Sequence, residues 1–228
     1  MLLELSFMNE HDLEEWVTTD FKSLKSRRHC VLWSAEPSSS SISQLVELRR
    51  QSLASDPTVR YLKVTDTDTG ELIACAKWNL YLSERSEAEL ERARRICQLI
   101  PEQDTPAMAE ILDLVHEQRR NCMGTRPHLL LSNLVTRPAH RRRGAGSMLI
   151  QWGLDYADGK ELTVYLEASE ETRLLYEKFG FQVFSEFSFN KAKYGGEGVD
   201  RYVVSFSRFE LPSPMVFREP PPSSQRVS

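Results

Sequence analysis

The chain has 228 residues, of which 40% are hydrophobic and 27% are charged, and its formal net charge is −4. A chain of this length buries about 70% of its unfolded surface, so it can hold a core without disulfides or a structural metal. The composition excludes global disorder and fibrous repeats. The acidic balance excludes the overall basic surface by which proteins bind nucleic acid, so an anionic ligand would need a local cluster of cations.

The N-terminus and the cysteines indicate an intracellular, reducing, cytoplasmic location and no membrane contact. The first ten residues are acidic and lack the basic start and the apolar run of about 7–15 residues of a signal peptide. No window approaches the ~18 apolar residues of a membrane span. The cysteines lie far apart without a C-x-x-C pair, and we expect no metal site; they are Cys30, Cys75, Cys97 and Cys122.

Hydrophobic spacing in the first half of the chain predicts helices around one β-hairpin. Asn9 is placed to cap an amphipathic helix, and after a serine loop at residues 38–41 a second helix ends before Asp56. The pattern then changes to that of strands around a polar turn at residues 66–70, which predicts a hairpin. The expected ranges are 9–24 and 42–55 for the helices, and 59–65 and 72–80 for the strands.

Residues 83–126 read as a helical insertion. A stripe of Leu90, Ala93, Cys97 and Ile100 predicts its first helix, and Thr105 is placed to cap the second, with Pro106 in the first turn. Two roles stay open for this insertion, a lid over a ligand site or plain packing.

The second half alternates strands and helices and ends in a proline-rich tail. Five of the eleven prolines lie between Leu211 and Ser228, where no periodic pattern is visible, so this segment is predicted to be disordered. Residues 1–210 are predicted to form one domain. The expected ranges are 128–136, 162–167, 181–189 and 201–209 for the strands, and 144–156 and 170–178 for the helices.

The segment from Leu129 to Ile150 carries the strongest chemical signal. An apolar strand ends at Thr136, and a loop rich in arginine and glycine leads directly into a helix that starts at Gly144. The first N–H groups of a helix have no internal partners and attract anions, so this arrangement predicts a pyrophosphate site. Taken alone, the arginine triplet of this loop would more often be a solvated turn.

Two common phosphate motifs do not fit the loop. A dinucleotide-binding G-x-G-x-x-G must follow its strand closely, but seven residues separate Thr136 from Gly144, and Leu149 occupies the third glycine position. A P-loop requires G-x-x-x-x-G-K-[ST]; Gly153 and Gly159 have one residue too many between them, and Glu161 follows the lysine.

The sequence Arg-Arg-Arg-Gly-Ala-Gly at 141–146 fits Arg-x-x-Gly-x-Gly, and here the chain resembles the GNAT family, the GCN5-related N-acetyltransferases. Leu-Tyr-Glu-Lys-Phe-Gly-Phe at 175–181 is similar to a second motif of that family. The resemblance covers about residues 129–182, is loose over 9–80 and does not extend to 83–126 or the tail. It implies a single α/β (α+β) domain with a central mixed, mostly antiparallel twisted sheet flanked by helices.

The resemblance also implies an acetyl-CoA co-substrate, no metal, and roles for individual residues. The backbone of one strand would pair with the pantetheine arm, the following loop would hold the pyrophosphate, and Tyr176 would protonate the departing CoA thiolate. Ser169 stands where many relatives have an asparagine that contacts CoA. The implied cofactor-binding residues are Leu134, Val135, Thr136, Arg141, Arg142, Arg143, Gly144, Ala145, Gly146, Ser147 and Ser169.

The base that deprotonates the amine is not evident from the sequence. Relatives often carry Glu or His at positions that match Leu130 and Ser132, neither of which is a strong base. A lysine-like amine is mostly protonated at neutral pH, so some group or a chain of waters must take its proton. Glu167 is the first candidate and His128 the second, although a structural role for Glu167 also fits.

The leading hypothesis is therefore an N-acetyltransferase that transfers acetyl from acetyl-CoA to an unidentified amine by direct attack. The first alternative is a non-catalytic acyl-CoA-binding module, because the base is not evident. The second is an interaction module that binds acidic partners through the arginine loop. The tryptophans are expected to be packing residues, although Trp16 and Trp78 could line an acceptor pocket.

Overall fold

The computed structural model describes residues 2–24, 31–95 and 99–207. Seven strands form one sheet in the order β1-β2-β3-β4-β5-β7-β6, in which every neighbouring pair is antiparallel except the parallel pair β4 and β5. This is the predicted mixed, mostly antiparallel α/β sheet. The strands are β1 (Leu3–Phe7), β2 (Val59–Asp66), β3 (Glu71–Tyr81), β4 (His128–Thr136), β5 (Val164–Ser169), β6 (Phe181–Asn190) and β7 (Val199–Ser207).

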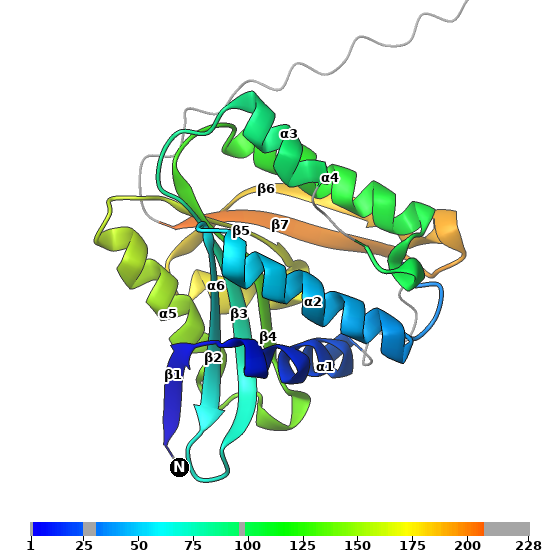
Figure 1. Cartoon of the computed structure of the whole chain (residues 1–228). Coiled ribbons are helices and arrows are strands. Elements are labelled where there is room, and N and C mark those ends of the chain that lie inside the picture. Colours follow the sequence, from blue (N-terminus) through cyan, green and yellow to red (C-terminus); the bar gives the residue numbers. More distant parts are fainter. Residues whose placement is uncertain (1, 25–30, 96–98, 208–228) are drawn as a thin grey trace, which may run out of the picture.

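Helices cover both faces of the sheet (Figure 1). On one face, buried side chains of α5 pack against Leu129, Leu131 and Trp78. The opposite face is covered by α1 and α2 over the first strands and by α4 over β5, β6 and β7. The helices are α1 (Leu13–Leu24), α2 (Ser39–Ser55), α3 (Glu87–Arg95), α4 (Pro106–Cys122), α5 (Ala145–Asp158) and α6 (Arg173–Glu177).

Helix α4 belongs to the core. Thr105 caps it by accepting a hydrogen bond from the Met108 N–H at 3.0 Å, and Pro106 stands in its first turn, as predicted. Its buried face, which includes Met108 and Ile111, packs with Tyr165 and Phe206 of the sheet. The second half of the 83–126 segment therefore has the packing role.

Strands β4 and β5 part in the middle of the sheet. They pair at only three positions, from Leu129 opposite Val164 to Leu131 opposite Leu166, and then each continues along its other neighbour, β3 or β7. Ser132 is an extra residue in β4, because Trp78 lies opposite Leu131 and Lys77 lies opposite Asn133. A bulge of this kind bends a strand, which helps to separate β4 from β5.

The structure corrects three local predictions. Strand β1 was not predicted, and it pairs with β2 at the edge of the sheet. The predicted serine loop is the start of α2, since Ser38 accepts a hydrogen bond from the Ser41 N–H as the N-cap. Ile100 is buried but lies beyond the end of α3, so it does not continue that helix's stripe.

The structure also places the tryptophans and two of the cysteines. Trp16 and Trp78 are 1% and 0% exposed, so they are packing residues and do not line an open pocket. Cys75 and Cys122 are buried free thiols. None of the described helices is long and apolar enough to cross a membrane. The predictions for Cys30, Cys97 and the tail at 211–228 lie outside the described residues.

Candidate active site

The opening between β4 and β5 offers strand edge to a ligand. At residues 132–136 the edge of β4 that faces β5 has no strand partner in the part of the chain that the structure describes. Val135 packs toward α1 and α2, while Leu134 packs toward α5, so the side chains alternate and the backbone is left at the edge. An extended ligand can hydrogen-bond to such an edge as an added strand. The predicted residues Leu134, Val135 and Thr136 all lie here.

The loop after β4 ends in a backbone conformation that favours anion binding. Arg142 has φ 65° and Gly144 has φ 93°, both in the left-handed region, and α5 begins at the next residue. Alternating left-handed residues turn successive N–H groups toward one side, which forms an anion-binding nest. The first N–H groups of α5, from Ala145 to Ser147, add the positive end of its dipole. Backbone strain at a non-glycine residue such as Arg142 is a feature that functional sites often retain.

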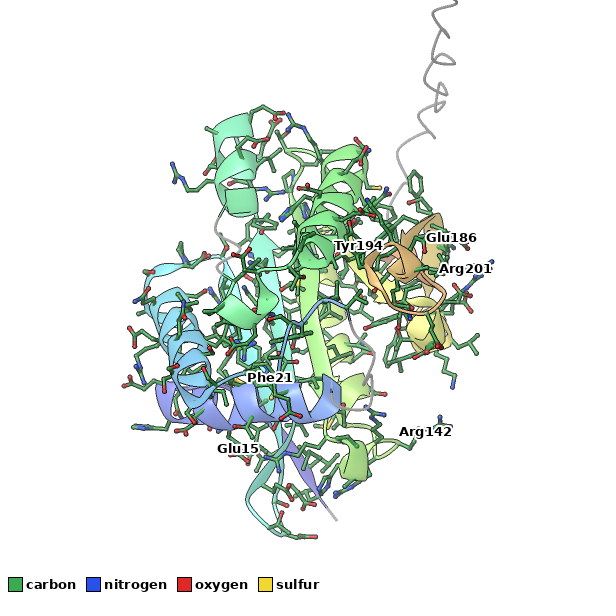
Figure 2. The ribbon with its side chains drawn as sticks, turned by 90° about the vertical axis from the view of Figure 1, so that its right-hand side faces the viewer. Glu15, Phe21, Arg142, Glu186, Tyr194 and Arg201 are labelled. Atoms are coloured by element: carbon green, nitrogen blue, oxygen red, sulfur yellow. The ribbon has the colours of Figure 1, made fainter. Side chains whose placement is uncertain are left out.

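The arginines of this loop divide into two groups. Arg141 and Arg142 are exposed and form no ion pair within the described part of the chain, and Figure 2 shows Arg142 projecting outward from the loop. Arg143 instead turns back and donates to the Asp66 carboxylate at 2.6 Å. Arg137 donates to Glu15 at 2.7 Å. Only the first group is directly available to a phosphate.

Tyr176 lies on the same face of the sheet as α5. Its ring is 8% exposed and meets Phe181 edge to face, with ring centroids 5.8 Å apart. Burial raises the pKa of its phenol to about 12. The hydroxyl therefore keeps its proton at neutral pH, as a general acid must before it acts. Its motif neighbour Gly180 has φ 83° just after α6, in agreement with the predicted left-handed cap.

Glu167 is held by an arginine from α4. Both carboxylate oxygens accept hydrogen bonds from the Arg119 guanidinium, at 2.7 and 2.9 Å, and the Glu167 side chain is only 7% exposed. Burial opposes the charge of Arg119, but the carboxylate overcomes this effect and raises the arginine's pKa. Arg119 is thus a neighbour of the site that the sequence did not reveal.

The remaining predicted residues differ in surroundings. His128, 2% exposed at the start of β4, hydrogen-bonds through Nδ1 to the Arg126 carbonyl oxygen at 2.7 Å, and burial lowers its pKa to about 4. Ser169 is half-buried at the end of β5, at the mouth of the opening, with its hydroxyl 3.4 Å from that of Thr172. Ser169 is therefore near the parted strands, whereas His128 lies at the opposite end of β4.

A polar cluster on the other side of β4 was also missed. Asp20 of α1 accepts hydrogen bonds from Arg49 at 3.0 Å and from Asn133 of β4 at 3.5 Å. The Arg49 guanidinium lies over the Trp16 ring, 3.8 Å from its centroid. This cluster ties α1 and α2 to the strand beside the opening. No local pattern announces it, because its members come from three separate elements.

Comparison with known proteins shows which family part of the chain resembles. Residues 104–183 match the family described as acetyltransferase (GNAT) domain. This part of the chain is therefore similar to a GNAT domain. The match begins at residue 104, so it includes α4, which the sequence motifs had left outside the resemblance.

A curated relative and two solved structures agree with this assignment. The chain is 36% identical over 64 residues to the probable acyltransferase SID5 of Ajellomyces capsulatus; this stretch is 28% of the chain and 47% of the relative, so the match spans about half of the relative's length. Arylalkylamine N-acetyltransferase 2 of Aedes aegypti is 11% identical, with a TM-score of 0.64 over 91% of this chain and 99% of that one. The PaiA N-acetyltransferase of Thermoplasma acidophilum, solved with coenzyme A, is 12% identical, with a TM-score of 0.50 over 92% and 100%. At such low identity these structures share the GNAT fold alone with this chain.

Among the residues that the structure describes, no three histidine, cysteine, aspartate or glutamate side chains gather as a metal site.

Proposed function

We propose that the protein is an N-acetyltransferase that transfers acetyl from acetyl-CoA to an amine by direct attack. The observation that carries this proposal is the parted pair β4 and β5, followed at once by the N–H nest before α5. The strand edge suits the amide-bearing pantetheine arm, and the nest suits the pyrophosphate. The one ligand would thus lie along residues 134–136 and end against the loop at 141–147, with Ser169 on the opposite strand.

The reaction needs two proton movements. The neutral amine nitrogen attacks the thioester carbonyl carbon, forming a C–N bond and a tetrahedral intermediate. The intermediate then collapses, the C–S bond breaks with its electron pair on sulfur, and the phenol of Tyr176 protonates the thiolate. The amine's proton goes to Glu167, directly or through water, and that group returns it to solvent, from which the Tyr176 phenolate takes up a proton again.

Glu167 needs a specific test because both of its carboxylate oxygens already accept hydrogen bonds from Arg119. A lysine-like amine has a pKa near 10.4, so it loses its proton without help as pH rises. If Glu167 receives the proton, Glu167→Gln should lower kcat at pH 7 and approach the wild-type kcat at about pH 10, where a large share of the amine is neutral. An equal loss at both pH values would remove Glu167 from the proton path.

The direct test of the proposed function is binding and turnover. A ligand that binds only the native state adds about 2.7 kcal/mol of stability at a hundredfold excess over its Kd. Acetyl-CoA should therefore raise the melting temperature, and an amine panel that includes arylalkylamines and polyamines should show one acetylated member. No shift with acetyl-CoA would overturn the proposal.

The ion-paired state of Glu167 favours one alternative, a module that binds acyl-CoA without catalysis. This alternative predicts the same thermal shift with acetyl-CoA but no acetylated product from any amine. Equal residual hydrolysis of acetyl-CoA by the wild type and by Tyr176→Phe would support it.

A further inference from the structure

Arg143 is turned away from the position that a phosphate ligand would need. Its Nη2 donates to Asp66 Oδ2 at 2.6 Å, and its Nη1 lies 2.6 Å from His140 Nδ1. The Arg143 side chain is 20% exposed and the Asp66 side chain only 6%. The hydrogen bond from Arg143 lowers the pKa of Asp66, so the carboxylate is charged at neutral pH. This partly buried ion pair joins the loop to the β2–β3 hairpin, 77 residues away in the sequence.

The hairpin holds Asp66 firmly. Its Oδ1 accepts from the Asp68 N–H at 3.1 Å, and its carbonyl oxygen accepts from the Gly70 N–H at 2.8 Å, so both ends of the residue are fixed in the turn. Asp66 is also paired in register with Glu71 across the hairpin. A carboxylate fixed in this way can act as an anchor for a side chain of another segment.

Glu71 provides a second anchor next to the first. Its carboxylate accepts from Arg137 at the start of the loop and lies 3.3 Å from His140 Nε2. The two hairpin carboxylates therefore hold the loop near both its ends, with Arg137 at one and Arg143 at the other. The exposed Arg141 and Arg142 lie between these fixed points.

We propose that Asp66, acting through Arg143, positions the loop that binds acetyl-CoA, and that Arg143 is a positioning residue and not a phosphate ligand. Arg143 stands between Arg142 and Gly144, whose left-handed conformations form the nest. Fixing Arg143 fixes both neighbours, whereas releasing it lets the strained Arg142 relax and the N–H groups turn away. The cations that meet the pyrophosphate are then Arg141 and Arg142. This inference rests on the proposed function.

Isothermal titration with acetyl-CoA on Asp66→Asn, Arg143→Gln and the double variant tests this assignment. Each single variant should weaken binding about tenfold, and the double variant should bind no worse than the weaker single variant, because both changes break one interaction. The result for Asp66→Asn is the sharper one. Asp66→Asn removes a negative charge beside an anion site, and the weaker repulsion would by itself tighten acetyl-CoA binding. Weaker binding by this variant would therefore indicate that the loop has lost its position.

Controls separate this role from a general effect on the fold. Glu4→Gln removes an equal charge from the exposed face of the neighbouring strand β1 and should leave Kd unchanged. Arg143→Lys, which keeps a cation for Asp66, should recover part of the lost affinity. With whichever amine is acetylated, Asp66→Asn should raise the KM for acetyl-CoA while kcat at saturation stays within about twofold.

The outcomes that overturn the inference are distinct from those that overturn the proposed function. If Arg143→Gln weakens binding while Asp66→Asn binds equally well or more tightly, Arg143 is a phosphate ligand and the inference fails. If the losses of affinity in the two single variants add up in the double variant, the two residues act separately and the inference also fails. If Arg143→Gln does not fold, the acetyl-CoA affinities of Asp66→Asn and Arg143→Lys test the inference without it. If the wild type does not bind acetyl-CoA, the proposed function itself fails.

Discussion

Tyr176 has the proton that a general acid for a thiolate must supply. It is buried beside Phe181, and burial raises its pKa to about 12, so it carries its proton throughout the neutral range. A positioned general acid contributes about 10²–10⁴-fold in rate. Tyr176→Phe keeps the ring and its packing and removes only the proton. We therefore expect kcat to fall at least tenfold, measured by steady-state kinetics, while the Kd for acetyl-CoA stays within a few-fold.

A second tyrosine provides the control. Tyr156 stacks on Trp152 on the same helix that begins at the nest, with ring centroids 5.5 Å apart. Tyr156→Phe should leave kcat unchanged. An unchanged kcat in Tyr176→Phe would make Tyr176 a packing residue, and a parallel loss of binding would mean that its hydroxyl also holds the thioester in the ground state.

His128 makes the stability of the fold dependent on pH. Its pKa is lowered to about 4 by burial, whereas an unfolded histidine has a pKa near 6.5. Between these values the unfolded chain binds a proton that the native state does not, so stability is lost as pH falls through this window. From pH 6.5 to 4.5 the loss from this one group should reach about 2–3 kcal/mol.

Urea unfolding at a series of pH values measures this loss. In His128→Gln the free energy of unfolding should depend much less on pH between 6.5 and 4.5, even if it is lower throughout. His11→Gln changes an exposed histidine and should keep the wild-type slope. If the slopes of wild type and His128→Gln agree, His128 is not the group that titrates.

At the scale of elements, α5 is held close to β3 by a glycine. A Cβ at Gly153 would come within 2.2 and 2.3 Å of the Trp78 ring, which is fully buried. Alanine gains about 1 kcal/mol over glycine in a helix, but overpacking costs about 1–3 kcal/mol and this overlap is severe. Gly153→Ala should therefore be net destabilising by about 2 kcal/mol in chemical denaturation.

The matched control is at the end of the same helix. A Cβ at Gly159 would lie 3.6 Å from the Asp155 carbonyl oxygen, an ordinary contact, in a right-handed conformation. Gly159→Ala should be neutral or stabilising. Equal stability of the two alanine variants would show that α5 can move away from Trp78 at little cost.

The loop before α5 is an element whose backbone carries the chemistry. Gly144 has φ 93° with open space around its Cβ position, so Gly144→Asp is strained but not blocked. Its carboxylate would stand where the pyrophosphate must approach the nest. We expect acetyl-CoA binding, measured by titration, to weaken more than about a hundredfold. Gly195→Asp, at φ 80° and also in open space, brings equal strain and charge and should leave binding unchanged.

If Gly144→Asp binds acetyl-CoA within about tenfold of the wild type, the phosphate site is elsewhere. The melting temperatures of the two aspartate variants show whether strain alone explains a loss. Similar melting temperatures with different affinities would assign the effect to the site.

At the scale of the molecule, the sequence predicted correctly those helices and strands whose positions depend on interactions between residues close in the chain. The strand, loop and helix from His128 to Asp158 lie in one stretch, and their positions agree with prediction. Strand β1 escaped prediction because five residues at a sheet edge are stabilised by their register with β2 and not by their own pattern. The serines at 38–41 suit a loop and a helix cap equally, so only the folded chain distinguishes them.

The ion pairs of the site also depend on contacts between residues that are far apart in the sequence. Arg143 reaches Asp66 across 77 residues, and Arg119 reaches Glu167 across 48. No spacing within one helix or strand encodes such pairs. The sequence therefore shows four arginines in the loop, while the fold decides which of them remain available to an anion.

The final prediction concerns how an acidic protein holds an anionic co-substrate. The formal net charge of −4 repels acetyl-CoA at long range, so attraction must come from Arg141 and Arg142 within a Debye length of about 8–10 Å. The double variant Arg141→Gln/Arg142→Gln should weaken binding at least tenfold at low salt and less at about 0.5 M salt, measured by titration. Arg92→Gln/Lys160→Gln removes the same charge from exposed sites on α3 and after α5, and should keep Kd within about twofold. Equal losses in the two double variants would mean that the charge of the whole molecule, and not the loop, sets the affinity.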